Sequence, residues 1–145
     1  MKNYLAIIFI FFSTYTFAEK LENFKLPIYN SKETFELKSK LKKHKYIVIN
    51  YWASWCTSCV QEMPELEALK KKYSKSTLFV GINAGERKKL IKKFLRKYKF
   101  SYLILEDKDR VVSKSHNVKE LPRTYVLNKQ GKIIFSGNRP PKAIP

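Results

Sequence analysis

Residues 46–64 read YIVINYWASWCTSCVQEMP, and this stretch decides the fold. Its first part, Tyr46–Trp52, is a nearly continuous run of β-branched and aromatic residues. A run that is apolar on both faces is typical of a buried strand in a parallel sheet. From Thr57 to Tyr73, apolar residues recur every three or four positions, which predicts a helix. Cys56 and Cys59 therefore lie at the junction between a buried strand and a helix.

This junction favours redox chemistry at the two cysteines. A Cys-x-x-Cys pair over a first helical turn has its Cα atoms about 5–6 Å apart, a distance that a disulfide can bridge. Unpaired N–H groups and the helix dipole stabilise a thiolate there, and lower a thiol pKa from about 8.5 to between about 3.5 and 7.5. We expect Cys56 to be the exposed nucleophile, and Cys59 to face the core and resolve the mixed disulfide. The alternatives are a permanent disulfide and half of a metal site. A permanent disulfide across so short a loop would add little stability.

The rest of the chain alternates strand and helix patterns. Further strands are predicted at residues 77–82 and 102–105, helices at 86–99 and 108–119, and short extended pieces within 22–37. A hairpin is predicted from strands 124–127 and 132–135, with Gly131 in its turn. This order indicates the α/β class, with a mixed β-sheet, mostly parallel, flanked by helices and carrying an antiparallel hairpin at its edge.

The N-terminus indicates export. A positive start at Lys2, an apolar run over residues 5–12 and a small residue, Ala18, form the plan of a secretory signal peptide. A membrane-spanning helix needs about 20 apolar residues, more than this run supplies. We expect residues 1–18 to be a cleaved signal and residues 19–145 to be one domain, periplasmic or otherwise extracytoplasmic. The alternative is that the segment stays attached as an N-terminal membrane anchor.

Composition excludes several classes of protein. The 145 residues are 44% hydrophobic, which excludes general disorder, and they include 30 Lys+Arg against 12 Asp+Glu, a formal charge of +18. Because the lysines are spread along the chain, we expect a solvated basic surface and no nucleic-acid partner. Two cysteines and two histidines at positions 44, 56, 59 and 116 make a poor zinc finger. We therefore predict no metal and no cofactor.

Residues 48–64 closely resemble the active-site segment of TlpA/ResA-like thioredoxin-fold thiol–disulfide oxidoreductases. The resemblance covers roughly residues 23–137. It includes Pro64, where this fold kinks its active-site helix, and the run Leu121-Pro122-Arg123-Thr124, which is similar to the family's cis-proline loop. The resemblance implies a thioredoxin-like fold and a cis bond before Pro122. It also implies that this loop faces the cysteines and binds a substrate chain, so that Leu121 and Pro122 contribute to substrate binding.

Three further residues acquire roles through the resemblance. Glu62 matches an acidic residue of the extracytoplasmic members, which implies that it tunes the cysteine pKa values or carries a proton to the resolving thiol. An exposed helix carboxylate is the alternative. Asn50 stands where cytoplasmic thioredoxins usually carry a buried Asp, which places more weight on Glu62. Trp55 is expected to form a partly exposed wall beside Cys56, with plain core packing as the alternative.

The sequence departs from the family in two places. Ser58 stands where Pro is usual, so the direction of electron flow cannot be taken from the family. No helix is predicted after the hairpin, although the fold normally ends with one. We expect the sheet face near Ile133 and Phe135 to bind a partner or to be covered by residues 139–145.

Three functions remain open. The first is an exported oxidoreductase that reduces particular protein disulfides, for example in apocytochrome c before haem attachment, and that a membrane-bound electron donor keeps reduced. The second is a general oxidant or isomerase of secreted proteins. The third is a thioredoxin-fold binding module without turnover, which the presence of Cys56, Cys59 and Pro122 disfavours. Peroxidase activity is disfavoured because the sequence has no Thr-x-x-Cys motif.

Overall fold

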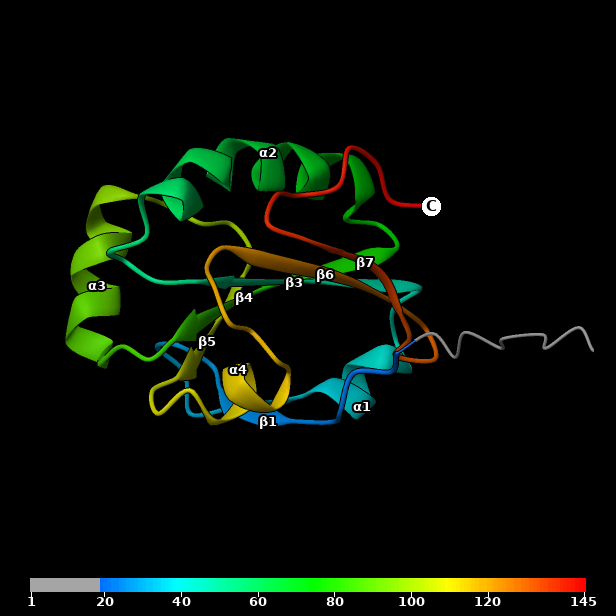
Figure 1. Ribbon diagram of the computed structural model, residues 1–145, viewed down its shortest axis with the longest axis horizontal. Helices are drawn as coiled ribbons and strands as arrows, with labels where there is room; N and C mark the ends of the chain where they lie inside the picture. The colour runs from blue at the N-terminus through cyan, green and yellow to red at the C-terminus, as the bar shows by residue number, and fades with distance from the viewer. Residues whose placement is uncertain (1–18) are drawn as a thin grey trace, which may run out of the picture.

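The centre of the molecule is a five-stranded sheet with the strand order β5-β4-β3-β6-β7. A computed structural model describes residues 19–145 (Figure 1), so the predicted signal peptide lies outside the described residues. β4 and β5 run parallel to β3, β6 runs antiparallel to β3, and β7 runs antiparallel to β6. The predicted α/β class with a mixed sheet is confirmed. The strands are β3 (Tyr46–Trp52), β4 (Thr77–Ala84), β5 (Leu103–Asp107), β6 (Arg123–Asn128) and β7 (Ile133–Gly137).

β3 is apolar on both faces because it is the middle strand, with a core on each side. Val48 and Trp52 belong to the core beneath the cysteine-bearing helix, which we call the α2-side core. Ile47, Ile49 and Tyr51 belong to the core on the opposite face of the sheet. The two strands that flank β3 bury its edges, so a continuous apolar run is the stable pattern there.

The helices divide between the two faces of the sheet (Figure 1). α2 (Thr57–Tyr73) and α3 (Lys88–Lys97) lie on one side, and α1 (Leu37–Leu41), α4 (Val111–Ser115) and the β1 (Lys25–Pro27) and β2 (Thr34–Glu36) pair lie on the other. α2 has the predicted bounds, with Pro64 inside it. α4 is shorter than predicted, because the Asp107 carboxylate accepts the N–H groups of Val112 and Ser113 and starts the helix there.

The end of the chain corrects one expectation about the hairpin. A β-bulge between Val126 and Leu127 pairs Phe135 with Val126 but Ile133 with Leu127. An extra residue in one strand reverses which face the following side chains occupy. Phe135 consequently packs against the α2-side core and Ile133 against the opposite core, so they do not share a face.

No helix follows β7 within residues 19–145, and the tail packs on the α2 side of the sheet instead. Figure 1 shows it rising from β7 towards α2. Ile144 is buried in the α2-side core, where it helps to cover the region that the predicted fold left open. The expectation that residues 139–145 cover part of the sheet is therefore confirmed for the side of Phe135.

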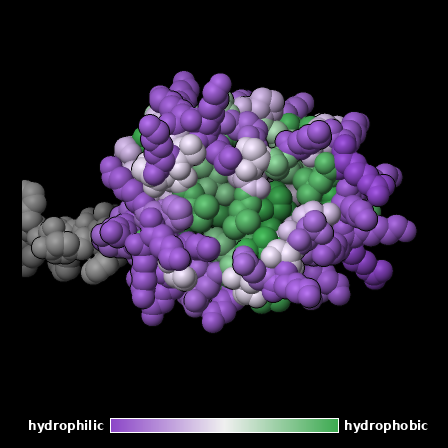
Figure 2. Space-filling model, turned by 180° about the vertical axis from the view of Figure 1, so that it is seen from behind, coloured by the Kyte–Doolittle hydropathy of each residue, from purple (hydrophilic) through white to green (hydrophobic). Residues whose placement is uncertain are grey.

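Hydrophilic side chains surround a hydrophobic area in the middle of the face shown in Figure 2. Within residues 19–145, the structure contains no helix with the length and apolar character needed to span a membrane.

Candidate redox site

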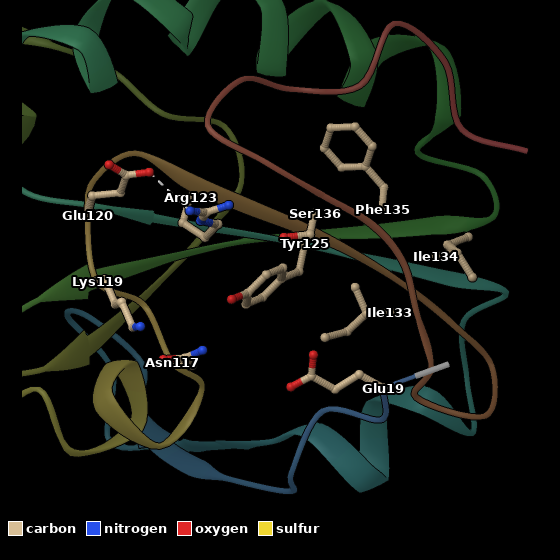
Figure 3. A pocket seen from close by; sticks show the side chains of 10 residues that line it. All are labelled: Glu19, Asn117, Lys119, Glu120, Arg123, Tyr125, Ile133, Ile134, Phe135 and Ser136. Carbon is tan, nitrogen blue, oxygen red and sulfur yellow. Dashed lines mark hydrogen bonds and ion pairs between the residues drawn. The ribbon is translucent and has the colours of Figure 1, made fainter. Parts of the chain in front are cut away.

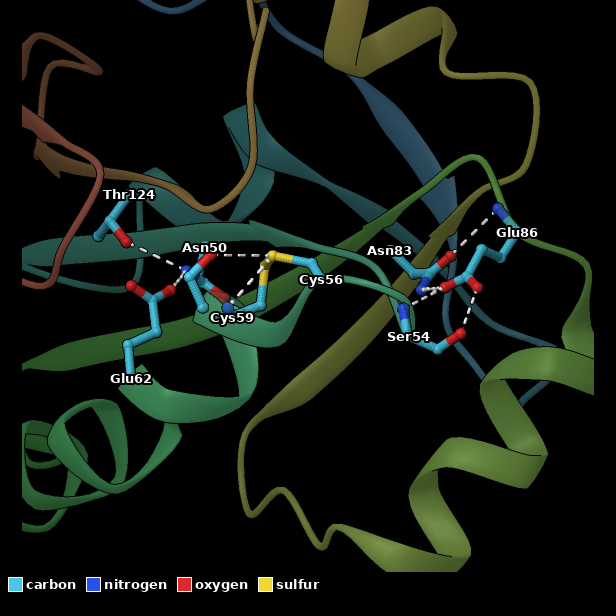
Figure 4. Close-up of a disulfide and its surroundings, with 9 residues drawn as sticks. Asn50, Ser54, Cys56, Cys59, Glu62, Asn83, Glu86 and Thr124 are labelled. Atoms are coloured by element: carbon cyan, nitrogen blue, oxygen red, sulfur yellow. Dashed lines mark hydrogen bonds between the residues drawn. A yellow bond between two sulfur atoms is a disulfide. The ribbon is translucent and has the colours of Figure 1, made fainter.

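A disulfide between Cys56 and Cys59 occupies the N-terminus of α2 (Figure 4). The Cα atoms are 5.2 Å apart, within the predicted range. Cys56 is the N-cap residue of α2, and its Sγ accepts the N–H of Cys59 at 3.1 Å. This places the Cys56 sulfur where a capping oxygen usually lies. A thiolate at this position would receive the same N–H and the favourable field of the helix N-terminus.

Cys56 is not exposed in the disulfide form, which corrects the sequence-based expectation. Its exposed fraction is 4%, and that of Cys59 is 2%. A disulfide joins the two sulfurs, and both residues pack with the α2-side core. The division of roles between an attacking Cys56 and a resolving Cys59 stays a prediction.

The predicted cis-proline loop lies at the same end of the sheet as the disulfide. The Leu121–Pro122 peptide bond is cis, as predicted. β6 starts at the next residue, and its register pairs Arg123 with Tyr51. Because β6 runs antiparallel to β3, the loop before β6 lies beside the end of β3 that leads to the cysteines. Pro122 is buried, and Leu121 packs against both cores.

Trp55 is exposed beside this end of the sheet. Its exposed fraction is 68%, so the alternative of core packing is wrong. An indole in this position offers a large apolar surface next to Cys56.

Glu62 is buried beneath the disulfide, so the alternative of an exposed helix carboxylate is wrong. Its exposed fraction is 5%. Asn50 Nδ2 donates to Glu62 Oε1 at 2.6 Å and to Thr124 Oγ1 at 3.1 Å. Glu62 Oε2 has no hydrogen-bond partner among residues 19–145. The side chain is thus tied to β3 through a single oxygen.

The pKa of Glu62 lies near neutrality. Burial raises it from 4.5 to about 7, although the Asn50 hydrogen bond lowers it; the Glu65 charge raises it further and the Arg139 charge lowers it. A carboxyl with a pKa near the working pH can both accept and donate a proton. Glu62 follows Cys59 by one helical turn, so it can serve the thiol that needs to lose its proton.

A second buried carboxylate, Glu86, was missed by the sequence analysis, which placed it at the start of a helix. It is 5% exposed and precedes α3. Its carboxylate accepts the Ser54 N–H at 2.7 Å, the Ser54 hydroxyl, and Asn83 Nδ2 at 2.7 Å. The sequence does contain a signal for this contact, the Asn-x-x-Glu spacing of residues 83–86, which resembles a capping box. In the structure, the Glu86 N–H donates to Asn83 Oδ1.

Glu86 holds the loop that carries Cys56. The Cys56 N–H donates to Ala53 O at 3.1 Å, which closes a turn over residues 53–56. Ser54 is the second residue of this turn, so the Glu86 carboxylate fixes it from the side opposite Glu62 (Figure 4).

Other cavities and clusters lie outside this site. A pocket of about 690 Å³ lies along the β6–β7 hairpin, lined by residues that include Tyr125 and Ile133 but neither cysteine (Figure 3). Among residues 19–145, no group of three or more His, Cys, Asp or Glu side chains could hold a metal ion. His116 follows α4 as its C-cap and is buried, with Nδ1 2.6 Å from the Tyr51 hydroxyl.

A mixed sheet, a Cys-x-x-Cys disulfide at a helix N-terminus and a neighbouring cis-proline define the thioredoxin-like class. The pattern of the AhpC/TSA family matches residues 17–136, and the chain belongs to this family. The predicted TlpA/ResA-like resemblance is confirmed as well. The thioredoxin-like protein YneN of Bacillus subtilis is 36% identical over 94 residues, 63% of this chain and 55% of that protein. The thiol-disulfide oxidoreductase ResA of Bacillus subtilis is 32% identical over 93 residues, 63% of this chain and 52% of that protein.

The chain thus spans about half the length of the curated relatives it matches. Among solved structures, the C-terminal domain of a thiol-disulfide oxidoreductase from Bacteroides thetaiotaomicron is similar over 85% of this chain and 87% of that chain. The TM-score is 0.75 and the sequence identity 26%. The predicted thioredoxin-like fold is therefore confirmed.

Proposed function

We propose that this protein is an exported thiol–disulfide oxidoreductase that reduces particular protein disulfides. The observation that carries the proposal is the Cys56–Cys59 disulfide at the N-terminus of α2, with the Cys59 N–H directed at Cys56 Sγ. That N–H would stabilise a Cys56 thiolate after reduction. The named function of ResA supports the same chemistry.

The reaction follows from the positions of the two sulfurs and Glu62. The Cys56 thiolate attacks one sulfur of a client disulfide, which forms a mixed disulfide and releases one client thiolate. Glu62 then accepts the proton of Cys59, and the Cys59 thiolate attacks Cys56 Sγ. This step forms the intramolecular disulfide and releases the second client thiolate. Two electrons pass to the client, and the protein ends in the oxidised form that the structure shows.

The setting of this reaction is also part of the proposal. The signal-like pattern of residues 1–18 supports a location outside the cytoplasm, in the periplasm or an equivalent compartment. There a membrane-bound electron donor would return the pair to the dithiol. Resemblance to TlpA/ResA-like proteins supports exported client proteins, with apocytochrome c before haem attachment as one candidate. The alternative is a general oxidant of secreted proteins, in which electrons flow in the opposite direction. This alternative stays open because Ser58 stands where the family usually has Pro.

The reduction potential of the Cys56–Cys59 pair distinguishes these directions. A value well below about −200 mV supports a reductase, and a value near about −120 mV supports an oxidant. Equilibration with glutathione or dithiothreitol buffers, followed by alkylation, measures it.

Trapping tests the division of labour between the sulfurs. Cys59→Ser should accumulate reductant-sensitive complexes with exported proteins, because the mixed disulfide cannot be resolved. Cys56→Ser should accumulate almost none. Equal trapping by both variants would show that the nucleophile is misassigned. No trapping by either, together with no dithiol activity in the native protein, would favour a binding module.

A further inference from the structure

A groove of about 460 Å³ runs between α2 and α3, away from the cis-proline loop. Figure 1 shows α3 beside the end of α2 at which the helix begins. Ser54 and Thr57 line the groove near the disulfide, and Tyr98 lines it at the end of α3. Ser54 and Thr57 lie two residues before and one residue after Cys56. A chain joined to Cys56 would therefore have this groove within reach of its neighbouring residues.

The lining of the groove is apolar with a basic rim. Val60 of α2 and Leu90 and Phe94 of α3 supply the apolar surface. Leu90 is 47% exposed, although the periodicity of α3 predicts that it faces the core. It lies at the border of the buried stripe, because the neighbouring Ile91 takes the central position.

The charges of the groove have one sign. Lys93 and Lys97 lie one helical turn apart on α3 and both line the groove, and none of its lining residues within 19–145 is acidic. Two cations beside an apolar surface complement a chain that carries apolar and acidic side chains together. The same helix carries a second basic pair, Lys92 and Arg96, with identical spacing but outside the lining.

We propose that the α2–α3 groove is a docking subsite for client polypeptides, which accepts an extended segment with apolar and acidic side chains next to the reacting cysteine. This inference rests on the proposed function and narrows the class of client. The groove adds contacts only for a polypeptide, so small disulfides should not benefit from it.

Short peptides test the proposal with the full chain in its reduced form. Each peptide carries one cysteine in a mixed disulfide with 5-thio-2-nitrobenzoate, and flanks of Leu and Glu, Leu and Lys, or Ser and Glu. The Cys56 thiolate attacks the peptide sulfur, a disulfide joins protein and peptide, and 5-thio-2-nitrobenzoate leaves as a coloured thiolate. The rate of its release measures docking and attack together.

We expect the Leu and Glu peptide to react fastest. Two exposed charge pairs contribute about two- to thirtyfold in rate, and this factor should shrink at high ionic strength. The double variant Lys93→Glu/Lys97→Glu should lose the preference for Glu over Lys flanks. Lys92→Glu/Arg96→Glu, which makes the same change of charge on the same helix, should keep it. Leu90→Ala should reduce the advantage of Leu over Ser flanks.

The outcomes separate this inference from the proposed function. An equal loss of the preference for Glu flanks in the two double variants would show that net charge alone attracts acidic peptides. This result would overturn the proposal that the groove binds clients. Equal rates for Leu and Ser flanks in the native protein would overturn it as well. A small uncharged probe, the mixed disulfide of 2-mercaptoethanol with 2-thiopyridine, should react equally with all variants. If the native protein fails to attack that small probe, the proposed function itself is wrong.

Discussion

Glu62→Gln should change how the stability of the oxidised protein depends on pH. Burial raises the pKa of Glu62 from 4.5 to about 7, so the folded state binds this proton more tightly than the unfolded state does. The resulting stabilisation is complete below pH 4.5 and is lost as the pH rises through 7. A separation of about 2.5 pH units at about 1.4 kcal/mol each gives about 3 kcal/mol. The native protein should lose about this much between pH 4.5 and pH 8 relative to the variant.

Gln suits this measurement because it removes the charge and keeps the main contact. Its Oε1 can still accept from Asn50 Nδ2, as Glu62 Oε1 does at 2.6 Å. Denaturant unfolding of both oxidised proteins at several pH values gives the difference. Disulfide-bonded cysteines do not titrate, and His116 contributes equally to both proteins. The exposed Glu33→Gln variant should show no such change.

A difference between native protein and Glu62→Gln that is constant from pH 4.5 to pH 8 would refute the reasoning. It would mean that Glu62 ionises at an ordinary pKa, through water reaching its free Oε2. In the reduced protein, Glu62→Gln should also shift the pH profile of Cys56 alkylation while the domain stays folded. An unchanged profile would remove Glu62 from the proposed proton transfer.

Three other predictions concern the loop before α2, the buried contact between Tyr51 and His116, and the N-terminus. Glu86→Ala should destabilise the fold by about 1–3 kcal/mol and slow Cys56 alkylation, because the Ser54 N–H loses its acceptor. Glu67→Ala is the control: Glu67 accepts the same two groups from Ser101 on an exposed surface, so alkylation should not change. His116→Phe should cost about 1–3 kcal/mol by leaving the Tyr51 hydroxyl unpaired. Since burial lowers the pKa of His116, its stabilisation is present above pH 6.5 and lost as the pH falls, so this cost should shrink in acid. Sequencing of the exported protein should find Glu19 first, and an intact Met1 in the membrane fraction would disprove cleavage.

Local patterns in the sequence predicted the parts of the fold that local chemistry determines. The bounds of β3 and α2 follow from one change of pattern, from a continuous apolar run to apolar residues at every third or fourth position. The structure has both elements as predicted. The place of the Cys56–Cys59 pair follows from the same change. The cis bond before Pro122 was implied by the family resemblance of residues 121–124, and the hairpin that follows it is itself a local structure, with Gly131 at positive φ in its turn.

The missed features depend on contacts between distant parts of the chain. Ser54 and Glu86 are joined only because β3 and β4 run parallel and end side by side. The bulge near Val126 leaves no mark in an apolar strand, yet it sends Ile133 and Phe135 to different faces. Burial of Cys56 also depends on distant parts of the chain, because Cys56 packs with the α2-side core.

Asn50 keeps a second acid away from Glu62. It lies in the central strand and joins Glu62 of α2 to Thr124 of β6, so the acid is held by the most deeply buried part of the sheet. A carboxylate in its place would lie within hydrogen-bond distance of Glu62, and two carboxylates so close raise the pKa of one of them strongly. The amide of Asn50 instead donates a hydrogen bond that favours the ionised form of Glu62 without adding charge. Burial and this one donor thus oppose each other, and their balance leaves the pKa of Glu62 at about 7, where one carboxyl can both take and return a proton.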